Sequence, residues 1–398
     1  MNILKLSYKN IVAKPLPTFS TVITLTLSIG LLLGVKQLNK VFESQLQQSL
    51  NGIDMVVGAK GSPLQLVLST VLHIDNPTGN IPYNEAKKIA ENKYIGEAIP
   101  VSIGDNYKGY KIVGTTVGFV NLYKTSLKDG VLFNEASEVV IGNAVAENLN
   151  LNVGDTFHSS HGMLENAIES HDDHPLIVVG ILKPTQNAID RLIVTNLETI
   201  WHVHEHESEN NNHNHDNEDI TALLLKFKNK RGLLFLPRNI NENTNFQAAL
   251  PKYQLDKLFK FTAIGTKAIT WIALAILFVS GITMFVSLYR MVKEKAKELA
   301  LIRTYGASRN KLILLVFSEG LLVGFFSFFL GILLATFSLQ TIFSLIKDTY
   351  KQQIYLLEYH IDILELFLFI FGIIVIATLI AIRPIFKMDI SKIISHES

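Results

Sequence analysis

Four long apolar segments alternate with polar stretches along this chain. The first, Pro15 to Val35, contains no Asp, Glu, Lys or Arg. Three more follow at Ala268 to Tyr289, Leu312 to about Leu345, and Leu364 to Ile382. About 20 helical residues, each rising roughly 1.5 Å, cross the ~30 Å of hydrocarbon in a bilayer. We therefore predict transmembrane helices at 16–36, about 266–289, about 312–340 and about 362–383.

The first apolar segment also resembles a secretory signal in its position near the N-terminus. Its apolar run is long for a signal peptide, and Ser28 to Lys36 offers no convincing small-x-small cleavage site. We therefore expect an uncleaved membrane anchor.

Basic residues mark three of the segments that flank the predicted spans. They are Lys5, Lys9 and Lys14 before the first, Arg290, Lys293, Lys295, Lys297, Arg303, Arg309 and Lys311 between the second and third, and Arg383, Lys387 and Lys392 after the fourth. Since cytoplasmic loops carry the excess of Lys and Arg, we expect both termini in the cytoplasm. Residues 1–15 then lie in the cytoplasm, and 37–262 lie outside.

The outer segment has the pattern of a mixed domain. Short alternating runs bounded by glycine, such as Ala98 to Gly104, Tyr110 to Gly114 and Leu176 to Leu182, predict strands. Helical spacing from Tyr83 to Asn92, and a stretch from Asn143 to Leu149 in which Asn143 could be the N-cap, predict helices. The predicted fold class is a membrane α-helical protein of four spans with an α+β extracytoplasmic domain inserted between the first two.

Composition excludes several kinds of chemistry. The 398 residues are 48% hydrophobic, with a formal net charge of +1, and this gives no reason to expect a nucleic-acid partner. The absence of cysteine excludes disulfides, thiolate metal sites and thiol nucleophiles. No Gly-Lys dipeptide occurs, so a Walker A loop is absent. We expect no enzymatic activity and no cofactor in this chain, with ATP bound by a separate subunit.

Nine of the twelve histidines lie between residues 158 and 219, in two tracts. The second tract, within a loop at 202–215, contains His202, His204, His206, His213 and His215. If 201–207 is extended, a period of two directs the first three histidines to one side, where neutral imidazoles can share zinc or copper. The alternative is a low-complexity insertion without a role.

Two acidic residues stand within or beside the predicted spans. Glu365 lies at the mouth of the fourth span, where it can reach lipid headgroups. Glu319 lies about two turns inside the third, where a lipid-facing carboxylate is costly, so we expect it to face protein. It would serve there either as a structural clamp between helices or in gating.

The loop between the second and third spans has an amphipathic pattern at 292–308. Val292, Ala296, Leu299 and Arg303 share one helical face. This segment would either lie on the lipid surface or dock in a groove of a partner protein.

The residues of this loop carry a resemblance to a known family. Lys297 to Arg309, followed by Glu319-Gly320, Gly324 and Gly331, resembles the loop and third span of the FtsX/MacB-like family of ABC transporter permeases. The resemblance implies that 292–308 is a coupling helix that binds the ABC ATPase. The residues implied in ATPase coupling are Lys297, Glu298, Leu299, Arg303, Gly306, Ala307 and Ser308.

Further segments are similar to the same family over nearly the whole chain. Leu6 to Asn10, before Pro15, resembles its N-terminal helix, which implies a cytoplasmic amphipathic helix at 1–15. Val139 to Asn143, Val153 to Asp155 and Ile177 to Leu182 resemble its MacB-like periplasmic core, which implies a core domain at 37–262 and an FtsX-like permease domain at 263–398. Two other segments, Val57 to Gln65 and Asp75 to Pro82, suggest a particular subgroup.

The resulting functional hypothesis is a permease subunit of an ABC-type complex in the bacterial inner membrane. It would pass ATPase-driven motion to its outer domain and export or extract a lipid-linked, peptide or toxic cargo. With four spans per chain, two copies are needed to enclose a seam, so we expect a homodimer, with a periplasmic adaptor or lipoprotein as a further partner. Two alternatives stay open, a signalling scaffold that activates a periplasmic enzyme and a metal-handling membrane protein.

Overall fold

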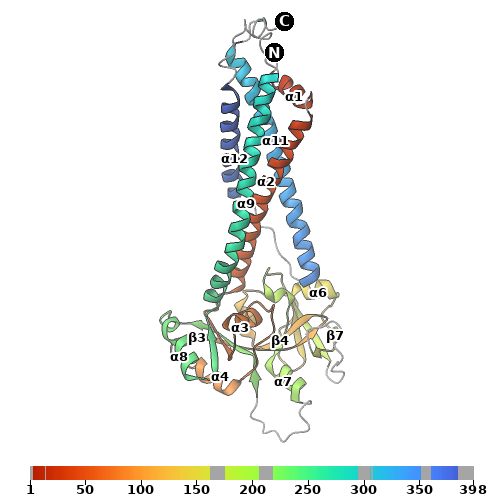
Figure 1. The fold of residues 1–398 in the computed structure, drawn as a ribbon. Coiled ribbons are helices and arrows are strands. Elements are labelled where there is room, and N and C mark those ends of the chain that lie inside the picture. The colour runs from red at the N-terminus through yellow and green to blue at the C-terminus, as the bar shows by residue number, and fades with distance from the viewer. Residues whose placement is uncertain are drawn as a thin grey trace. The chain divides into compact units, whose positions relative to one another are not determined.

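The computed structural model describes residues 3–13, 15–161, 175–205, 218–294, 305, 308–350 and 360–383. The chain divides into a helical unit and a mixed unit (Figure 1). The helical unit comprises Met1–Val41, Thr262–Asp348 and Leu356–Ser398, and the mixed unit comprises Phe42–Phe261 and Thr349–Tyr355.

In the described residues, the helical unit contains a short N-terminal helix and four long ones. They are α1 (Ile3–Ala13), α2 (Pro15–Ser49), α9 (Pro251–Glu294), α11 (Arg309–Tyr350) and α12 (His360–Ala381). Each of the four long helices contains a stretch that is long and apolar enough to cross a membrane. The prediction of four spans, with the mixed domain between the first two, is confirmed. Because α2 ends at Ser49 and α9 begins at Pro251, both helices extend well beyond the predicted spans.

Small residues let the spanning helices approach closely. A Cβ added to Gly331 of α11 would lie 2.6 Å from Ile29 Cγ2 of α2. A Cβ at Gly324, two turns earlier in α11, would overlap the Ile374 side chain of α12. Packing of this kind stabilises helix pairs in lipid, where the hydrophobic effect does not drive association.

Hydroxyl groups add hydrogen bonds across the same helices. Ser28 Oγ of α2 and Ser280 Oγ of α9 are 3.1 Å apart, and Thr26 Oγ1 donates to the Ser327 carbonyl of α11 at 3.4 Å. These bonds satisfy polar groups that would be costly if they faced hydrocarbon.

The described part of the mixed unit is built on an eleven-stranded sheet. Its main path runs β13-β1-β12-β3-β4-β10-β6-β9-β5, β7 pairs with β9, and β8 pairs with β3. The strands are β1 (Met55–Ala59), β3 (Ile95–Tyr107), β4 (Tyr110–Thr115), β5 (Leu127–Gly130), β6 (Glu138–Ile141), β7 (Thr156–Phe157), β8 (Ser160–His161), β9 (Leu176–Leu182), β10 (Ile193–Asn196), β12 (Ala222–Phe227) and β13 (Phe246–Ala249). A separate pair joins β2 (Ile81–Pro82) and β11 (Asp219–Ile220). Most pairs are antiparallel, but β10 with β4 and β6 with β9 are parallel.

Both faces of the sheet are buried, which explains why its central strands are apolar at nearly every position. Val113, Val140 and Val194 join one core cluster, whereas their neighbours Ile112 and Ile193 join a cluster on the opposite face. A period of two places successive side chains on opposite faces, so these short runs are apolar at nearly every position.

Helices of the mixed unit follow the strands in sequence. They are α3 (Pro63–Thr70), α4 (Tyr83–Ala90), α5 (Val117–Leu122), α6 (Asn143–Leu149), α7 (Leu197–Glu205) and α8 (Gly232–Asn243), with a 3-10 turn η1 (Ala188–Arg191). The helix predicted from Tyr83 is confirmed. The helix at 143–149 is also present, but its N-cap is Gly142 rather than Asn143. Asn143 instead donates from Nδ2 to Glu147 Oε1 at 2.9 Å.

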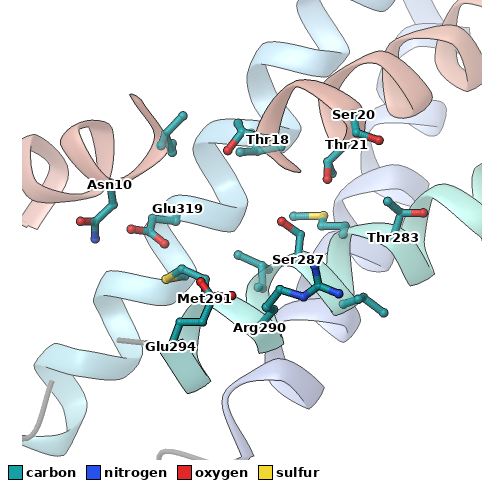
Figure 2. Close-up of a pocket in the computed structure, with 15 residues that line it drawn as sticks. Asn10, Thr18, Ser20, Thr21, Thr283, Ser287, Arg290, Met291, Glu294 and Glu319 are labelled. Carbon is teal, nitrogen blue, oxygen red and sulfur yellow. The ribbon is translucent and has the colours of Figure 1, made fainter. Parts of the chain in front are cut away.

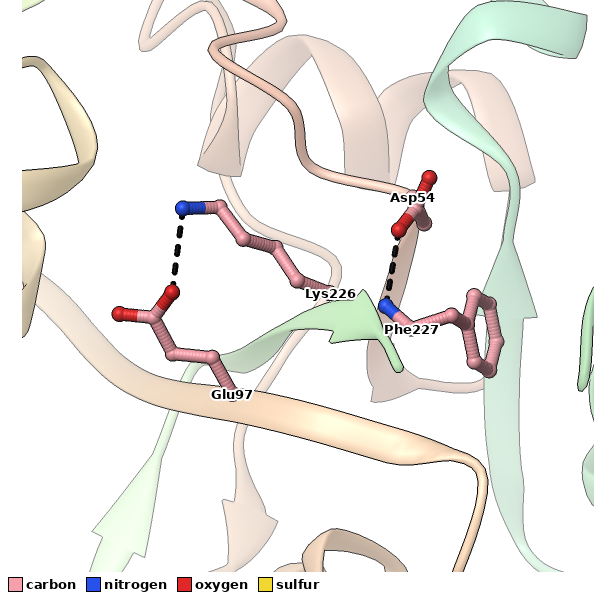
Figure 3. A network of polar contacts seen from close by, with 4 residues as sticks. All are labelled: Asp54, Glu97, Lys226 and Phe227. Atoms are coloured by element: carbon pink, nitrogen blue, oxygen red, sulfur yellow. Dashed lines mark hydrogen bonds and ion pairs between the residues drawn. The ribbon is translucent and has the colours of Figure 1, made fainter. Parts of the chain in front are cut away.

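A polar network holds the irregular end of β12 (Figure 3). The pairing of β12 with β3 shifts register between Lys226 and Phe227. The Phe227 N–H donates to Asp54 Oδ2 at 2.8 Å, and Lys226 Nζ pairs with Glu97 Oε2 at 3.0 Å. A side-chain carboxylate thus accepts from an amide at the point where the strand pairing is irregular.

Candidate functional site

A polar cavity of about 280 Å³ lies within the helical unit. Its lining comes from α1, α2, α9 and α11: Asn10, Ile11, Thr18, Ser20, Thr21, Thr283, Met284, Val286, Ser287, Leu288, Arg290, Met291, Glu294, Glu319 and Val323. Figure 2 shows Asn10 and Glu319 toward one side of this cavity and Thr283 toward the other. The lining offers a guanidinium, two carboxylates, an amide and several hydroxyls, so the cavity is suited to polar or charged groups.

Glu319 is the buried acid of this cavity. Its side chain is only 4% exposed, on the third spanning helix. The prediction that Glu319 faces protein is therefore confirmed, because a lipid-facing position would be exposed in the single chain. Its role as a clamp or in gating stays a prediction.

The N-terminal helix contacts α11 next to Glu319. Ser7 Oγ and Ser318 Oγ are 2.5 Å apart, and Ser7 Oγ also donates to the Leu315 carbonyl at 3.3 Å. Ser7 is fully buried. Sequence reasoning missed this contact, although a lone serine between apolar and basic residues of an amphipathic helix is a signal for such an interhelical bond.

The cavity adjoins the predicted coupling segment along the chain. Arg290 and Glu294 stand in the last turns of α9, directly before that segment. Within it, Tyr305 is 88% exposed. Ser308 is also exposed, and its backbone carbonyl accepts the Lys311 N–H at 3.0 Å where α11 begins. The other residues implied in coupling lie outside the described residues: Lys297, Glu298, Leu299, Arg303, Gly306 and Ala307. The coupling role stays a prediction for all seven.

Helix contacts place three chain segments at one end of the helical unit. The cavity joins Asn10 of α1 to Arg290 of α9 and Glu319 of α11. A Cβ at Gly320 would lie 2.7 Å from Thr378 Oγ1, near the end of α12. The three basic segments therefore adjoin the same end of the helical unit, as the charge pattern requires. That this end faces the cytoplasm stays a prediction.

An ion pair stands at the other end of the helices. Lys36 Nζ of α2 lies 2.7 Å from Glu365 Oε2 of α12. Sequence reasoning placed Glu365 near headgroups and missed this partner. A lysine directly after the first span and an acid directly before the fourth were the available signal, since antiparallel spans bring those two positions together.

The second histidine tract is only partly described. Residues 197–205 form helix α7, so the extended geometry assumed for 201–207 is wrong for 201–205, and a period of two does not align His202 with His204. The reason is local: Asn196 Oδ1 accepts the Thr199 N–H at 2.9 Å and caps the helix. His202 is exposed. His206, His213 and His215 lie outside the described residues.

The first histidine tract gives little more. His158 is exposed, His161 ends β8, and His171 and His174 lie outside the described residues. Among the residues that the structure describes, no three His, Asp or Glu side chains group as a metal site. Zinc binding by the second tract stays a prediction.

Comparisons with known proteins match both parts of the chain. The model of the FtsX-like permease C-terminal family matches residues 270–390, and that of the MacB-like periplasmic core domain matches residues 18–230. No curated protein matches the chain.

Two solved structures are similar to the chain at 13% identity. One is the periplasmic region of MacB from Actinobacillus actinomycetemcomitans. The match covers 52% of this chain and 95% of the MacB chain, with a TM-score of 0.34. The other is the extracellular domain of the noncanonic ABC-type transporter YknZ from Gram-positive bacteria. The match covers 49% of this chain and 98% of the YknZ chain, with a TM-score of 0.31.

Proposed function

Because the chain belongs to the FtsX/MacB-like family of ABC permeases, we propose that it is the subunit through which a separate ATPase moves a cargo at the outer face of the bacterial inner membrane. In this proposal the chain does not hydrolyse ATP. It converts hydrolysis by its partner into motion of its mixed domain.

The observation that carries this proposal is the continuity of α9. This helix runs without a break for 44 residues from Pro251, two residues after the last strand of the mixed unit, to Glu294. At roughly 1.5 Å per residue it is about 66 Å long. A continuous helix is a stiff element that can carry displacement between distant sites. The continuity of α9 supports the transmission of motion from the segment after Glu294 to the domain before Pro251.

The polar cavity supports the same proposal. Arg290 and Glu294 share its lining with Asn10 and Glu319 from two other helices. A displacement of the segment that follows Glu294 would change this lining first. The cavity therefore gives the coupling segment a route to α1 and α11 as well as along α9.

The proposed assembly contains two copies of the chain and two ATPase subunits. Four spans from one chain do not enclose a central seam, whereas a twofold pair does. A periplasmic adaptor or lipoprotein would accept the cargo, which we propose to be lipid-linked, a peptide or a toxic compound. The signalling alternative is a scaffold that activates a periplasmic enzyme by the same motion.

A charge reversal in the coupling segment tests the proposal. Glu298→Arg should lower the ATP hydrolysis of the complex reconstituted in nanodiscs by at least severalfold, while leaving the fold intact. Glu397→Arg, the same reversal near the C-terminus on the same predicted side, is the matched control. Equal ATPase rates in the two variants and the unchanged chain would contradict the docking of this segment.

Affinity purification of the full chain separates transport from signalling. Recovery of an adaptor, lipoprotein or outer-membrane channel supports transport. Recovery of a cell-wall hydrolase without any of these supports the scaffold alternative.

Metal handling is a second candidate function, suggested by the five histidines between residues 202 and 215. We propose zinc as the ion, since neutral imidazoles are common zinc ligands. Calorimetry on the full chain should show binding in the micromolar range or tighter, and replacement of His202, His204, His206, His213 and His215 by Ala should abolish it. Binding weaker than tens of micromolar in the unchanged chain would remove this candidate.

A further inference from the structure

Two segments that the transport proposal does not use meet in the mixed unit. Val57 to Gln65 runs into the first turn of α3, and Asp75 to Pro82 follows that helix in the sequence. Thr78 Oγ1 donates to the Ala59 carbonyl at 3.3 Å, and Gln65 Nε2 donates to the Asn76 carbonyl at 3.2 Å. These bonds bring the two segments together and fix the chain that returns from the end of α3.

The turn after α3 is held by two cations from distant elements. Arg191 of η1 donates from Nη2 to the Leu72 carbonyl at 3.0 Å. Lys111 of β4 donates from Nζ to the Asp75 carbonyl at 2.5 Å. Between these two carbonyls stands His73, whose φ of 55° lies in the left-handed region that residues other than glycine rarely adopt. The His73 imidazole therefore lies within electrostatic reach of both cations.

His73 is buried and has no hydrogen-bond partner within the described part of the chain. Its side chain is 5% exposed, and neither Nδ1 nor Nε2 is bonded there. The ring packs edge-on against Phe119, with centroids 6.0 Å apart. A neutral imidazole carries one N–H donor and one acceptor nitrogen, so both are left unsatisfied at a buried position.

Tyr123 adds a second unsatisfied group to the same cluster. Its ring packs against Phe119 from another direction at 5.2 Å, its side chain is 4% exposed, and its hydroxyl also lacks a partner among the described residues. Leaving a buried polar group unpaired costs about 1–3 kcal/mol. Native structures resolve such groups with an ordered water or an ion.

The charge of the cluster distinguishes between water and an ion. Burial, and then Lys111 and Arg191, hold the pKa of His73 well below its ordinary value. Burial, and then Arg191, lower the pKa of Lys111 to about 8, although Asp75 acts in the opposite direction. The cluster therefore disfavours further positive charge, which argues against a metal cation on His73.

No carboxylate forms a direct ion pair with these cations in the described residues, although Asp75 acts on Lys111 and Asp190 on Arg191 from farther away. Asp190 directs its oxygens to the backbone N–H groups of Thr185 and Gln186 at 2.8 to 3.0 Å, and Asp75 Oδ1 accepts its neighbour's N–H. Neither Lys111 nor Arg191 forms an ion pair in the part of the chain that the structure describes. Buried charges are normally paired, so the cluster lacks an anion.

We propose that His73, Lys111, Tyr123 and Arg191 form a binding site for a compact monovalent anion, either a halide such as chloride or a small carboxylate. The anion accepts from the Tyr123 hydroxyl, the His73 N–H and the remaining guanidinium donors, and it neutralises part of the cationic charge. A water molecule supplies the hydrogen bonds without the charge.

Anion exchange on the full chain in nanodiscs tests this site. The unfolding temperature of the mixed unit should rise when sodium chloride or sodium formate replaces sodium gluconate at constant ionic strength, because gluconate is too large to enter. A response to halide identifies the halide source, and a response only to formate identifies the carboxylate source. The same unfolding temperature in all three salts would overturn the proposal.

Two variants locate the response. Tyr123→Phe removes one oxygen and keeps the ring, and Lys111→Met removes one charge. Each should raise about tenfold the anion concentration that gives half of the increase in unfolding temperature. This is the loss expected for one hydrogen bond or charge contact of about 1.4 kcal/mol. Lys128→Met, which removes an exposed lysine of the same unit, should leave it unchanged. An anion response of equal size in all three variants would place binding elsewhere and overturn the site.

Bromide gives a direct image of the same site. Crystals of the full chain grown in sodium bromide should show an anomalous peak between Arg191 and Tyr123. The absence of anomalous signal at this position, with density for a water molecule there instead, would contradict the proposal.

Discussion

Lys36 Nζ lies 2.7 Å from Glu365 Oε2, so an ion pair joins the first and the fourth spanning helices. The two side chains are 45% and 73% exposed. Their contact shows that the end of the first apolar span lies beside the start of the fourth, at the end of the helices opposite to the cavity near Glu319. The pair thus supports the antiparallel order of spans that the sequence predicts.

The exposure of this pair limits its contribution to stability. A double-mutant cycle with Lys36→Met and Glu365→Gln should give a coupling free energy of at most about 1 kcal/mol, because exposed ion pairs are screened and lose side-chain entropy. The measurement is thermal or denaturant unfolding of the four variants in one detergent. A coupling above about 2 kcal/mol would show that the membrane desolvates the pair.

Close packing of α2 against α11 predicts a larger effect. Gly331→Ala should lower the free energy of unfolding by about 1–3 kcal/mol, because its Cβ would lie 2.6 Å from Ile29 Cγ2 and 2.8 Å from Ile29 Cβ. Gly372→Ala is the matched control, since a Cβ there meets nothing within 4 Å. It should be neutral or stabilising by up to about 1 kcal/mol through helix propensity.

Intrinsic fluorescence followed on heating measures both variants. Ile29→Ala should cost less stability in the Gly331→Ala background than in the unchanged chain, since there it also removes the clashing Cγ2 atom. Equal unfolding temperatures for Gly331→Ala and Gly372→Ala would show that the two helices do not approach this closely.

The elements that sequence reasoning placed well are those set by local pattern. The strand at Leu176–Leu182 and the helix that starts at Tyr83 follow from hydrophobic spacing and a preceding turn or proline. The four spans follow from apolar length alone. The polar continuations of α2 to Ser49 and of α9 back to Pro251 were missed, because no apolar run marks them.

The failures have identifiable physical causes. Alternate histidines from His202 suggested an extended segment, but the Asn196 cap starts a helix there, so a backbone signal outweighed the composition of the tract. The cluster of Lys111, Arg191 and His73 was not predictable, because it joins elements far apart in sequence. Ser7 with Ser318 was missed for the same reason.

Glu319 offers a test of its structural role. Glu319→Ala should destabilise the helical unit by about 1–3 kcal/mol, because it removes a buried polar group from its surroundings. Glu319→Gln keeps hydrogen-bonding capacity and should cost less than about 1 kcal/mol. Unfolding in detergent measures both. If Glu319→Gln keeps its stability but lowers the ATPase rate of the complex, Glu319 acts in gating rather than as a clamp.

Lys111 predicts a pH dependence for the mixed unit. Burial and Arg191 lower its pKa to about 8 in the folded chain, below the ordinary 10.5. Between these two values the unfolded chain binds more protons, so the contribution of Lys111 to stability rises with pH from about 8 to 10.5. The free energy of unfolding, measured in gluconate, should therefore rise more steeply in the unchanged chain than in Lys111→Met. Parallel profiles would contradict the lowered pKa.

The central claim is that the mixed domain and the coupling segment face opposite sides of the membrane. The chain has no cysteine, so single Cys variants report their side without interference. Lys128→Cys and Tyr305→Cys both replace exposed side chains. A membrane-impermeant maleimide should label Lys128→Cys in intact spheroplasts and Tyr305→Cys only after permeabilisation. Labelling of both variants in intact spheroplasts, or of neither, would contradict the account.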